Sequence, residues 1–334
     1  MTRPQPRHAQ RRAWLAVAIA AGVLAPATVA VAASPEAGAP DPASRIVFGR
    51  VTHNDDFYGP VVQLWAIDPD GTDLVQLTDG MSAFPAISPD GSTIAFTQGQ
   101  ADASWQIATM AADGSDLKVL TSGPGVSEAP GWSPDGTWMA YDMTPTTTVD
   151  ASFHTVLRRM ASDGTDDQLL GRVNTFVAEP HISPDGTKVA FVRIDISGDR
   201  QQNELIVRDL ATGTELALDG AGRAPEHPVW SPDGTSVLYQ VSPWLGSGNP
   251  NVQLERIPAD GSAAPTVIVA GTDTQKASKP AYSPDGKRIA FTCAGPKNDA
   301  LCIANADGSD IHVLSDDPAM DENFASWGVA APVS

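Results

Sequence analysis

Two histidines stand close to glutamates in this chain, a combination of side chains suited to metal-assisted chemistry. His181 follows Glu179 by two residues, and His227 follows Glu226 directly. Imidazole and carboxylate ligands together suit zinc or manganese, so His181 and His227 are the candidate metal ligands. No tight spacing such as His-x-x-x-His strengthens this hypothesis. The alternative is two unrelated polar residues, one lining a channel and the other capping a strand.

An internal repeat positions both histidines. The tetrapeptide Ser-Pro-Asp-Gly occurs five times at steps of 45, 50, 48 and 52 residues, starting at Ser88, Ser133, Ser183, Ser231 and Ser283. Each copy follows a proline three residues earlier and precedes a short strand-like run. A period of this length is typical of a β-propeller, in which each blade has four strands.

A second turn recurs between these copies. Asp-Gly, or Thr-Gly in one case, separates two apolar runs at six places, which begin at Asp70, Asp113, Asp163, Thr212, Asp260 and Asp307. This dipeptide indicates a hairpin, because Gly accepts positive φ and Asp can bond its own backbone. Each repeat unit should therefore contain two tight hairpins, and the fold class should be all-β.

The two ends of the repeat region complement each other. Residues 45–50 (RIVFGR) match the strand that normally follows Ser-Pro-Asp-Gly, and residues 323–327 (NFASW) match the strand that normally precedes it. We therefore expect a six-bladed propeller of four-stranded antiparallel blades over residues 45–329. Pairing of the C-terminal strand with the first blade would close the ring and remove exposed sheet edges.

Residues near the proline of each inner strand form the candidate binding site. Inner strands converge on the propeller axis, so one position per blade should surround the axial mouth. The candidate residues of this rim are Glu128, Glu179, His181, Glu226, His227, Lys279 and Phe324. Variable positions on a regular scaffold are where sites for ligands or partners occur. The alternative is a solvated rim without a ligand.

The loops between the second and third strands should open on the same face. Their candidate contact residues are His53, Asp55, Asp56, Tyr58 and Trp244. Exposed aromatic side chains beside acids suit contacts with protein or sugar. In the alternative arrangement, Trp244 folds back onto its own blade.

The first 33 residues have the pattern of an export signal. Four arginines and no acid precede or begin a long apolar run, which ends in small residues suited to cleavage. A retained membrane anchor is the alternative. Residues 34–44 should be a flexible spacer and residues 330–334 a tail. We expect a protein of the periplasm, the cell surface or the exterior, exported by the Sec or the twin-arginine route.

Net charge excludes two kinds of partner. The chain after the signal holds 17 basic and 40 acidic residues, a net charge of −23. Nucleic acids and anionic membranes both require a basic face, so neither is an expected partner. We expect a monomer that has no membrane span once the signal is removed.

The two cysteines, Cys293 and Cys302, flank a short loop in the last full repeat. In a hairpin they could sit opposite each other, and an exported chain meets an oxidising compartment. We therefore expect a disulfide that joins the two ends of this loop. Two free buried thiols are the alternative.

The repeat unit resembles the TolB-like propeller repeat of bacterial envelope proteins. The resemblance rests on the proline, the apolar residue and Ser-Pro-Asp-Gly, followed by a strand, a loop, a strand and Asp-Gly, and it covers residues 45 to about 329. It implies a six-bladed propeller that serves as a protein-binding platform; some relatives hold ligands or metals over the axis. TolB itself carries an N-terminal α/β domain, for which the spacer at 34–44 leaves no room. The expected relationship is therefore to TolB-like propellers and not to TolB itself.

Two classes of enzyme have a similar propeller. Prolyl-oligopeptidase-type peptidases need Gly-x-Ser-x-Gly and an α/β-hydrolase domain, and the chain has neither. Oligogalacturonate lyases, which this propeller also resembles, gather histidines around a metal over the axis. A metal-dependent carbohydrate-active enzyme, lyase or hydrolase, is therefore the alternative function. The leading expectation is a non-catalytic module without a cofactor that binds an envelope or extracellular protein, or a glycan.

Overall fold

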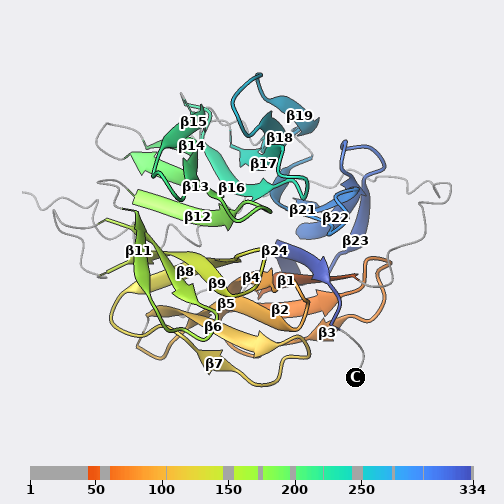
Figure 1. The fold of residues 1–334 in the computed structure, drawn as a ribbon. Coiled ribbons are helices and arrows are strands. Elements are labelled where there is room, and N and C mark those ends of the chain that lie inside the picture. Colours follow the sequence, from red (N-terminus) through yellow and green to blue (C-terminus); the bar gives the residue numbers. More distant parts are fainter. Residues whose placement is uncertain are drawn as a thin grey trace, which may run out of the picture.

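The computed structural model describes residues 44–52, 61–102, 104–145, 154–171, 176–195, 201–220, 222–242, 251–272, 275–295 and 297–331. Regular structure in these segments consists of strands, and none of the described residues is helical. In Figure 1 the strands gather into small sheets, with β3, β7, β15, β19 and β23 at the periphery and β4, β16 and β24 near the middle.

Four sheets contain four strands each, with neighbours antiparallel. The first is, in spatial order, β24 (Met320–Val329), β1 (Ser44–Thr52), β2 (Val61–Ile67) and β3 (Val75–Gln76). The second is β12 (Phe176–Ile182), β13 (Lys188–Asp195), β14 (Gln202–Asp209) and β15 (Glu215–Asp219). The third is β16 (Pro225–Trp230), β17 (Ser236–Val241), β18 (Gln253–Pro258) and β19 (Thr266–Val269). The fourth is β20 (Ala277–Tyr282), β21 (Arg288–Ala294), β22 (Asp299–Asn305) and β23 (His312–Ser315).

The remaining eight strands form one sheet, which corrects the expectation of six separate blades. They are β4 (Ser82–Ile87), β5 (Thr93–Gly99), β6 (Trp105–Ala111), β7 (Lys118–Val119), β8 (Val126–Trp132), β9 (Trp138–Thr144), β10 (Val156–Ala161) and β11 (Gln168–Gly171). One parallel pairing, Trp105 with Val126, joins β6 to β8. The physical reason for the difference is therefore a single backbone contact between two otherwise antiparallel four-stranded groups.

The C-terminal strand pairs with the first strand, as the sequence predicted. Trp327 of β24 lies opposite Ile46 of β1, and Glu322 lies opposite Arg50. Figure 1 shows β24 beside β1 although they come from opposite ends of the described chain. The inner strands contact one another in a closed circuit, in the order β24, β4, β8, β12, β16, β20 and back to β24. The fold is an all-β propeller built of four-stranded antiparallel blades.

The Ser-Pro-Asp-Gly turns are held by their own side chains. In the fourth copy the hydroxyl of Ser231 donates to Asp233 Oδ1 at 2.6 Å, and the backbone N–H of Thr235 donates to the same oxygen at 3.0 Å. Gly234 has φ of 71°, a left-handed conformation that Gly adopts without steric cost. These hydrogen bonds, the one from Ser231 first, lower the pKa of Asp233. This aspartate therefore builds a turn.

Successive turns also pack on one another. A Cβ built on Gly136 would lie 3.7 Å from Pro89 of the preceding turn, and one on Gly286 would lie 3.4 Å from Pro232. At Gly91 the neighbour is instead the carbonyl oxygen of Val329, only 2.5 Å from such a Cβ. The end of β24 therefore takes the place of the missing turn before the first Ser-Pro-Asp-Gly.

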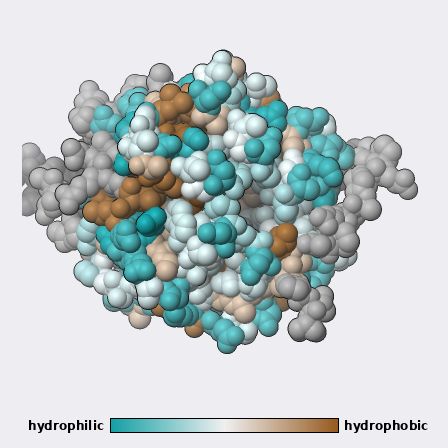
Figure 2. All heavy atoms as spheres, viewed as in Figure 1, coloured by the Kyte–Doolittle hydropathy of each residue, from teal (hydrophilic) through white to brown (hydrophobic). Residues whose placement is uncertain are grey.

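Apolar cores lie between neighbouring sheets. The fourth residue of each strand that follows a repeat turn, or its counterpart in β1, is a fully buried aromatic: Phe48, Phe96, Tyr141, Phe191, Tyr239 and Phe291. The two tyrosines keep their hydroxyls paired, to Asp167 at 2.9 Å and to Asp219 at 2.7 Å. On the face drawn in Figure 2, hydrophilic and neutral residues dominate and apolar residues gather mainly in one band.

Cys293 and Cys302 form the predicted disulfide, which joins β21 to β22. Both cysteines are buried in the core between the last two sheets.

Candidate functional site

One residue in each inner strand has a left-handed backbone conformation, although none of these residues is glycine. The six φ angles lie between 51° and 58°, at Phe84, Ala129, Glu179, His227, Lys279 and Phe324. In five of the six strands the next residue is proline, which itself disfavours the α region for the residue before it. Such strain is kept only where the surrounding structure holds it, and it is concentrated at functional sites. We call these six residues the axial slots.

A β-bulge at each slot explains this conformation. In β12, for example, the pairing with β13 shifts between Ala178 and His181, and Glu179 lies within the shift. Equivalent shifts occur at the other inner strands. Because a bulge re-aims a side chain, it sets the direction of the slot residue.

Slot backbone N–H groups are bound by side chains of the preceding blade. Ala129 N donates to Thr97 Oγ1 at 3.1 Å, and Glu179 N donates to Asp142 Oδ1 at 3.1 Å. Lys279 N donates to Gln240 Oε1 at 3.2 Å. These hydrogen bonds couple three of the inner strands, β8, β12 and β20, to the preceding blade.

The backbone N–H of His227 is bound differently. The equivalent strand position of the preceding blade holds Val192, whose side chain has no hydrogen-bond acceptor. Val192 pairs with Ala178, the residue before the slot of its blade. Asp142 and Gln240 pair with the equivalent residue in their own blades. Glu179 supplies the acceptor instead. Its Oε2 accepts from His227 N at 2.6 Å, and its Oε1 lies 2.9 Å from His227 Nδ1. Burial raises the pKa of Glu179, but the charge and hydrogen bonds of His227 outweigh it, and the pKa is lowered.

Two phenylalanines and a lysine form the opposite side of the cluster. The rings of Phe84 and Phe324 lie 4.4 Å apart between centroids in a tilted arrangement. Lys279 Nζ lies 3.8 Å from the centroid of Phe324, a cation–π contact. The ring of His227 meets the edge of Phe324 at 6.1 Å. All four side chains are half-buried, so water reaches them.

The remaining members of the cluster are carboxylates. Burial, and then the charge of Glu179, raise the pKa of Glu128 to about 7. Burial and the charge of Glu128 raise the pKa of Asp142 well above its usual value. The pKa of Glu226 is also raised, by burial first. We call the set of Phe84, Glu128, Asp142, Glu179, Glu226, His227, Lys279 and Phe324 the axial cluster.

Lys279 is the cation of this cluster. Burial, followed by the charge of Lys276, lowers its pKa to about 8, against the attraction of Asp299, Glu179 and Glu226. The ammonium group is therefore mostly charged at neutral pH. The cluster as a whole presents one lysine and one histidine to four carboxyl groups, beside two aromatic rings.

His181 lies apart from the contacts of His227. Its Nδ1 accepts from the backbone N–H of Trp230 at 3.4 Å, and its carbonyl oxygen accepts from the indole of Trp230 at 3.0 Å. Burial lowers the pKa of His181 to about 4, so this imidazole is neutral. No group of three or more His, Cys, Asp or Glu residues able to hold a metal occurs in the described part of the chain.

The structure thus connects most predicted rim residues and adds others. Glu128, Glu179, Glu226, His227, Lys279 and Phe324 are linked by contacts or by charge, whereas His181 packs between blades. Asp142 and Gln240 were not predicted. The sequence feature that could have identified them is a polar residue at a strand position where another blade has Val192. The loop residues His53, Asp55, Asp56, Tyr58 and Trp244 lie outside the described residues.

The pairing of the strands into blades, together with the axial cluster, defines the fold as a β-propeller whose inner strands surround a polar centre. The family model described as the TolB beta propeller domain matches residues 57–263, and the chain belongs to this family, as its repeat predicted. One curated relative is the Tol-Pal system protein TolB of Anaeromyxobacter dehalogenans, strain 2CP-C. It is 29% identical over 179 residues, which cover 52% of this chain and 38% of the relative.

Two solved structures share the fold. TolB from Acinetobacter baumannii aligns with a TM-score of 0.68 and 19% identity, covering 85% of this chain and 66% of that one. A putative TolB from Agrobacterium tumefaciens aligns with a TM-score of 0.62 and 18% identity, covering 87% of this chain and 99% of that one. The chain spans well under half the length of the curated TolB relatives it matches. The described residues include no helix with the length and apolar character of a membrane span.

Proposed function

We propose that this protein is an exported, non-catalytic propeller that binds a partner protein of the cell envelope or exterior through its axial cluster. The observation that carries this proposal is the set of six strained slots, none of which is glycine. A left-handed residue is accommodated best by glycine. Side chains kept there in spite of the strain are best explained by what they present to a ligand.

The cluster also indicates the chemistry of the partner. Phe84 and Phe324 offer an aromatic platform for an apolar anchor residue. Glu128, Asp142 and Glu226 offer carboxyl groups that a basic side chain would keep ionised. The net charge of −23 after the proposed signal would draw a basic segment toward the molecule. We therefore favour a partner segment that combines an apolar side chain with a positive charge.

The organisation of the whole chain follows the same proposal. Residues 1–33 would direct export and residues 34–43 would be a spacer. Because β1 begins at Ser44, which pairs with Val329, the propeller would span residues 44–329. We interpret the eight-stranded sheet as two blades that touch at Trp105 and Val126, which makes a six-bladed ring. The loops at 53–60 and 243–250 would extend the binding face.

Photo-crosslinking in the producing cell tests this proposal. A benzophenone amino acid placed at Phe84 should capture one specific protein. The matched control is Val119, an exposed residue of the outer strand β7, which should capture nothing specific. Equal capture from both positions, or capture from Val119 alone, would move the interface away from the axis. A second probe at Phe324 guards against a fold defect caused by the first.

A further inference from the structure

A pocket lies between the last two four-stranded sheets, away from the axial cluster. It has a volume of about 590 Å³ and is lined by turn and strand residues of both sheets, among them Ser231, Asp233, Arg256, Asp260, Tyr282 and Asp285. Tyr282 follows Lys279 by three residues, so the pocket and the axial slot are about 10 Å apart along β20. Pockets of this volume hold small molecules.

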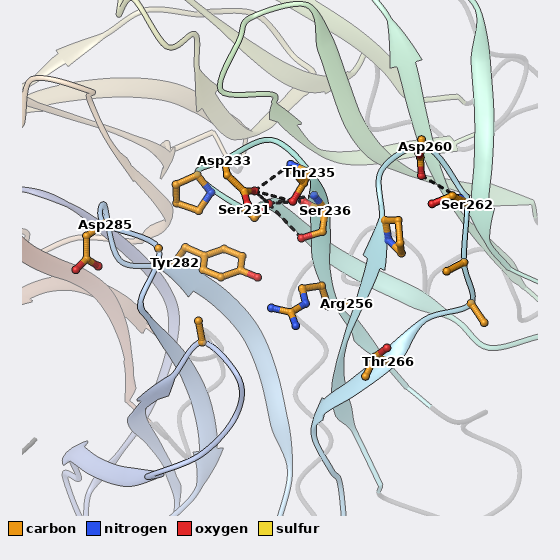
Figure 3. A pocket seen from close by; sticks show the side chains of 16 residues that line it. Ser231, Asp233, Thr235, Ser236, Arg256, Asp260, Ser262, Thr266, Tyr282 and Asp285 are labelled. Atoms are coloured by element: carbon orange, nitrogen blue, oxygen red, sulfur yellow. Dashed lines mark hydrogen bonds between the residues drawn. The ribbon is translucent and has the colours of Figure 1, made fainter.

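Tyr282 gives this pocket an unmet hydrogen-bonding group. The residue is 9% exposed, and its hydroxyl oxygen makes no hydrogen bond of normal geometry, although Arg256 lies near enough to interact with it. Trp132 and Trp230, which precede Ser-Pro-Asp-Gly in other blades, donate instead to carbonyl oxygens of the preceding inner strand at 3.0 Å. Figure 3 shows the Tyr282 ring lying across the pocket, with its hydroxyl directed toward Arg256. The hydroxyl proton of Tyr282 therefore remains available to a ligand, because a guanidinium donates hydrogen bonds and cannot accept one.

Arg256 is the second polar residue of the pocket that could bind a ligand. It is half-buried, and among the described residues no carboxylate forms a salt bridge with it. Its counterpart by strand register in another blade, Arg159, covers the ring of Trp138 at 5.7 Å. The guanidinium of Arg256 therefore keeps donors for an acceptor within the pocket.

The carboxylates of the pocket are committed to their turns but retain acceptor capacity. Asp233 accepts from Ser231 and Thr235, and Asp260 accepts from the backbone N–H of Ser262 at 2.9 Å. An ionised carboxylate has about four acceptor positions, so each can take a further donor. Asp285, which pairs with Lys287 at 3.2 Å, also lines the pocket, so three carboxylates and one guanidinium contribute to its wall.

This balance of charge selects the class of ligand. A small anion would meet three carboxylates, and a small cation would meet Arg256. A neutral polyhydroxylated molecule supplies acceptors to Arg256 and Tyr282 and donors to the carboxylates. We propose that this pocket binds a neutral sugar, one or two rings in size, independently of the axial cluster.

Titrations of the purified mature chain, followed by saturation-transfer NMR, test the proposal. The probes are maltose, cellobiose and diacetylchitobiose, with inorganic phosphate and putrescine as the charged comparators. At least one of the sugars should bind saturably at millimolar concentration. The variants Tyr282→Phe and Arg256→Gln should each weaken that binding at least tenfold. Arg159→Gln, at the matching register of another blade, should leave it unchanged.

Tyr282→Phe is the decisive variant because it removes a hydroxyl that makes no hydrogen bond of normal geometry and interacts only with Arg256, so the thermal midpoint should change little. Glu179→Gln, in the axial cluster, should not alter sugar binding. The proposal is overturned if no sugar binds, if phosphate or putrescine binds more tightly than every sugar, or if sugar binding survives both pocket variants.

Discussion

Glu179 holds His227 of the neighbouring blade with both of its carboxylate oxygens. Oε1 lies 2.9 Å from the imidazole Nδ1, and Oε2 accepts from the backbone N–H at 2.6 Å. The arrangement replaces an acceptor that Val192 cannot provide. One side chain therefore fixes a slot backbone and presents an imidazole beside Phe324.

Replacing Glu179 by Gln should destabilise the fold by about 1.5 to 3 kcal/mol at neutral pH, the range for hydrogen bonds to charged groups. The pKa of Glu179 is lowered in the folded state. Its contribution is therefore present above the unfolded pKa, near 4.5, and is lost as the pH falls through the folded pKa. Denaturant titrations over a pH series measure this. A difference between wild type and variant that persists undiminished in strong acid would contradict the assignment.

Glu128→Gln should show the opposite dependence. Its pKa is raised to about 7 in the folded state, so its neutral form is favoured there. The associated stability is present below the unfolded pKa, near 4.5, and is lost as the pH rises through about 7. Above that pH the variant should be more stable than wild type by on the order of 1 to 3 kcal/mol. In acid the two should converge.

The matched control for both pH series is Asp316→Asn, an exposed acid on the surface. It should shift neither profile. If Glu128→Gln follows the wild-type curve at every pH, Glu128 is solvated and not part of a coupled cluster.

Ring closure should depend on the buried pair of Arg50 and Glu322. Glu322 Oε1 accepts from two guanidinium nitrogens of Arg50, at 2.9 and 2.7 Å, and from Ser315 Oγ at 2.8 Å. Glu322→Ala leaves the buried Arg50 with only the longer ion pair to Asp317, at 3.6 Å, so it should cost about 3 kcal/mol. Thermal and denaturant unfolding measure the loss.

Two further variants define that result. Arg45→Gln, which breaks a more exposed pair with Asp73, should cost less than about 1 kcal/mol. The double variant Arg50→Met with Glu322→Met should recover much of the stability, because no charge remains buried. Equal effects of Glu322→Ala and Arg45→Gln would show that closure does not rest on this pair.

Removal of the disulfide should lower stability by about 2 to 3 kcal/mol, because Cys293 and Cys302 close a short loop in the unfolded chain. The double variant Cys293→Ala with Cys302→Ala is compared with wild type, oxidised and reduced. Reduced wild type should unfold at nearly the same denaturant concentration as the double variant. A wild type unaffected by reduction would show that the bond contributes nothing to stability.

Much of the fold was predictable because the repeated motifs consist of residues that specify turns. Ser-Pro-Asp-Gly fixes φ by its Pro and Gly and ties its Ser to its Asp, so each copy predicts a hairpin on its own. The match of residues 323–327 to the strand that precedes Ser-Pro-Asp-Gly predicted closure. The parallel contact between Trp105 and Val126 was not predictable, since it involves one residue pair between strands of different units.

The candidate site was predictable only in part. His181 and Glu179 are two residues apart, a spacing that puts side chains on one face of a regular strand. The bulge between them breaks that alternation, and His181 packs against Trp230 instead. Asp142 was missed for a related reason: its role depends on pairing with Glu128 and on the adjacent blade, neither of which is a local sequence feature.

The most direct test of the central claim is capture of a partner by residues 34–334 from the envelope of the producing cell after chemical crosslinking. The bait is compared with a variant in which Glu179, His227 and Lys279 are all replaced by Gln. The matched control replaces three exposed residues of the same kinds, Asp316, His312 and Lys287, by Asn, Gln and Gln. The account predicts one specific protein captured by wild type and control and lost from the axial variant. Retention of that protein by the axial variant, in its folded state, would contradict a partner site at the axis.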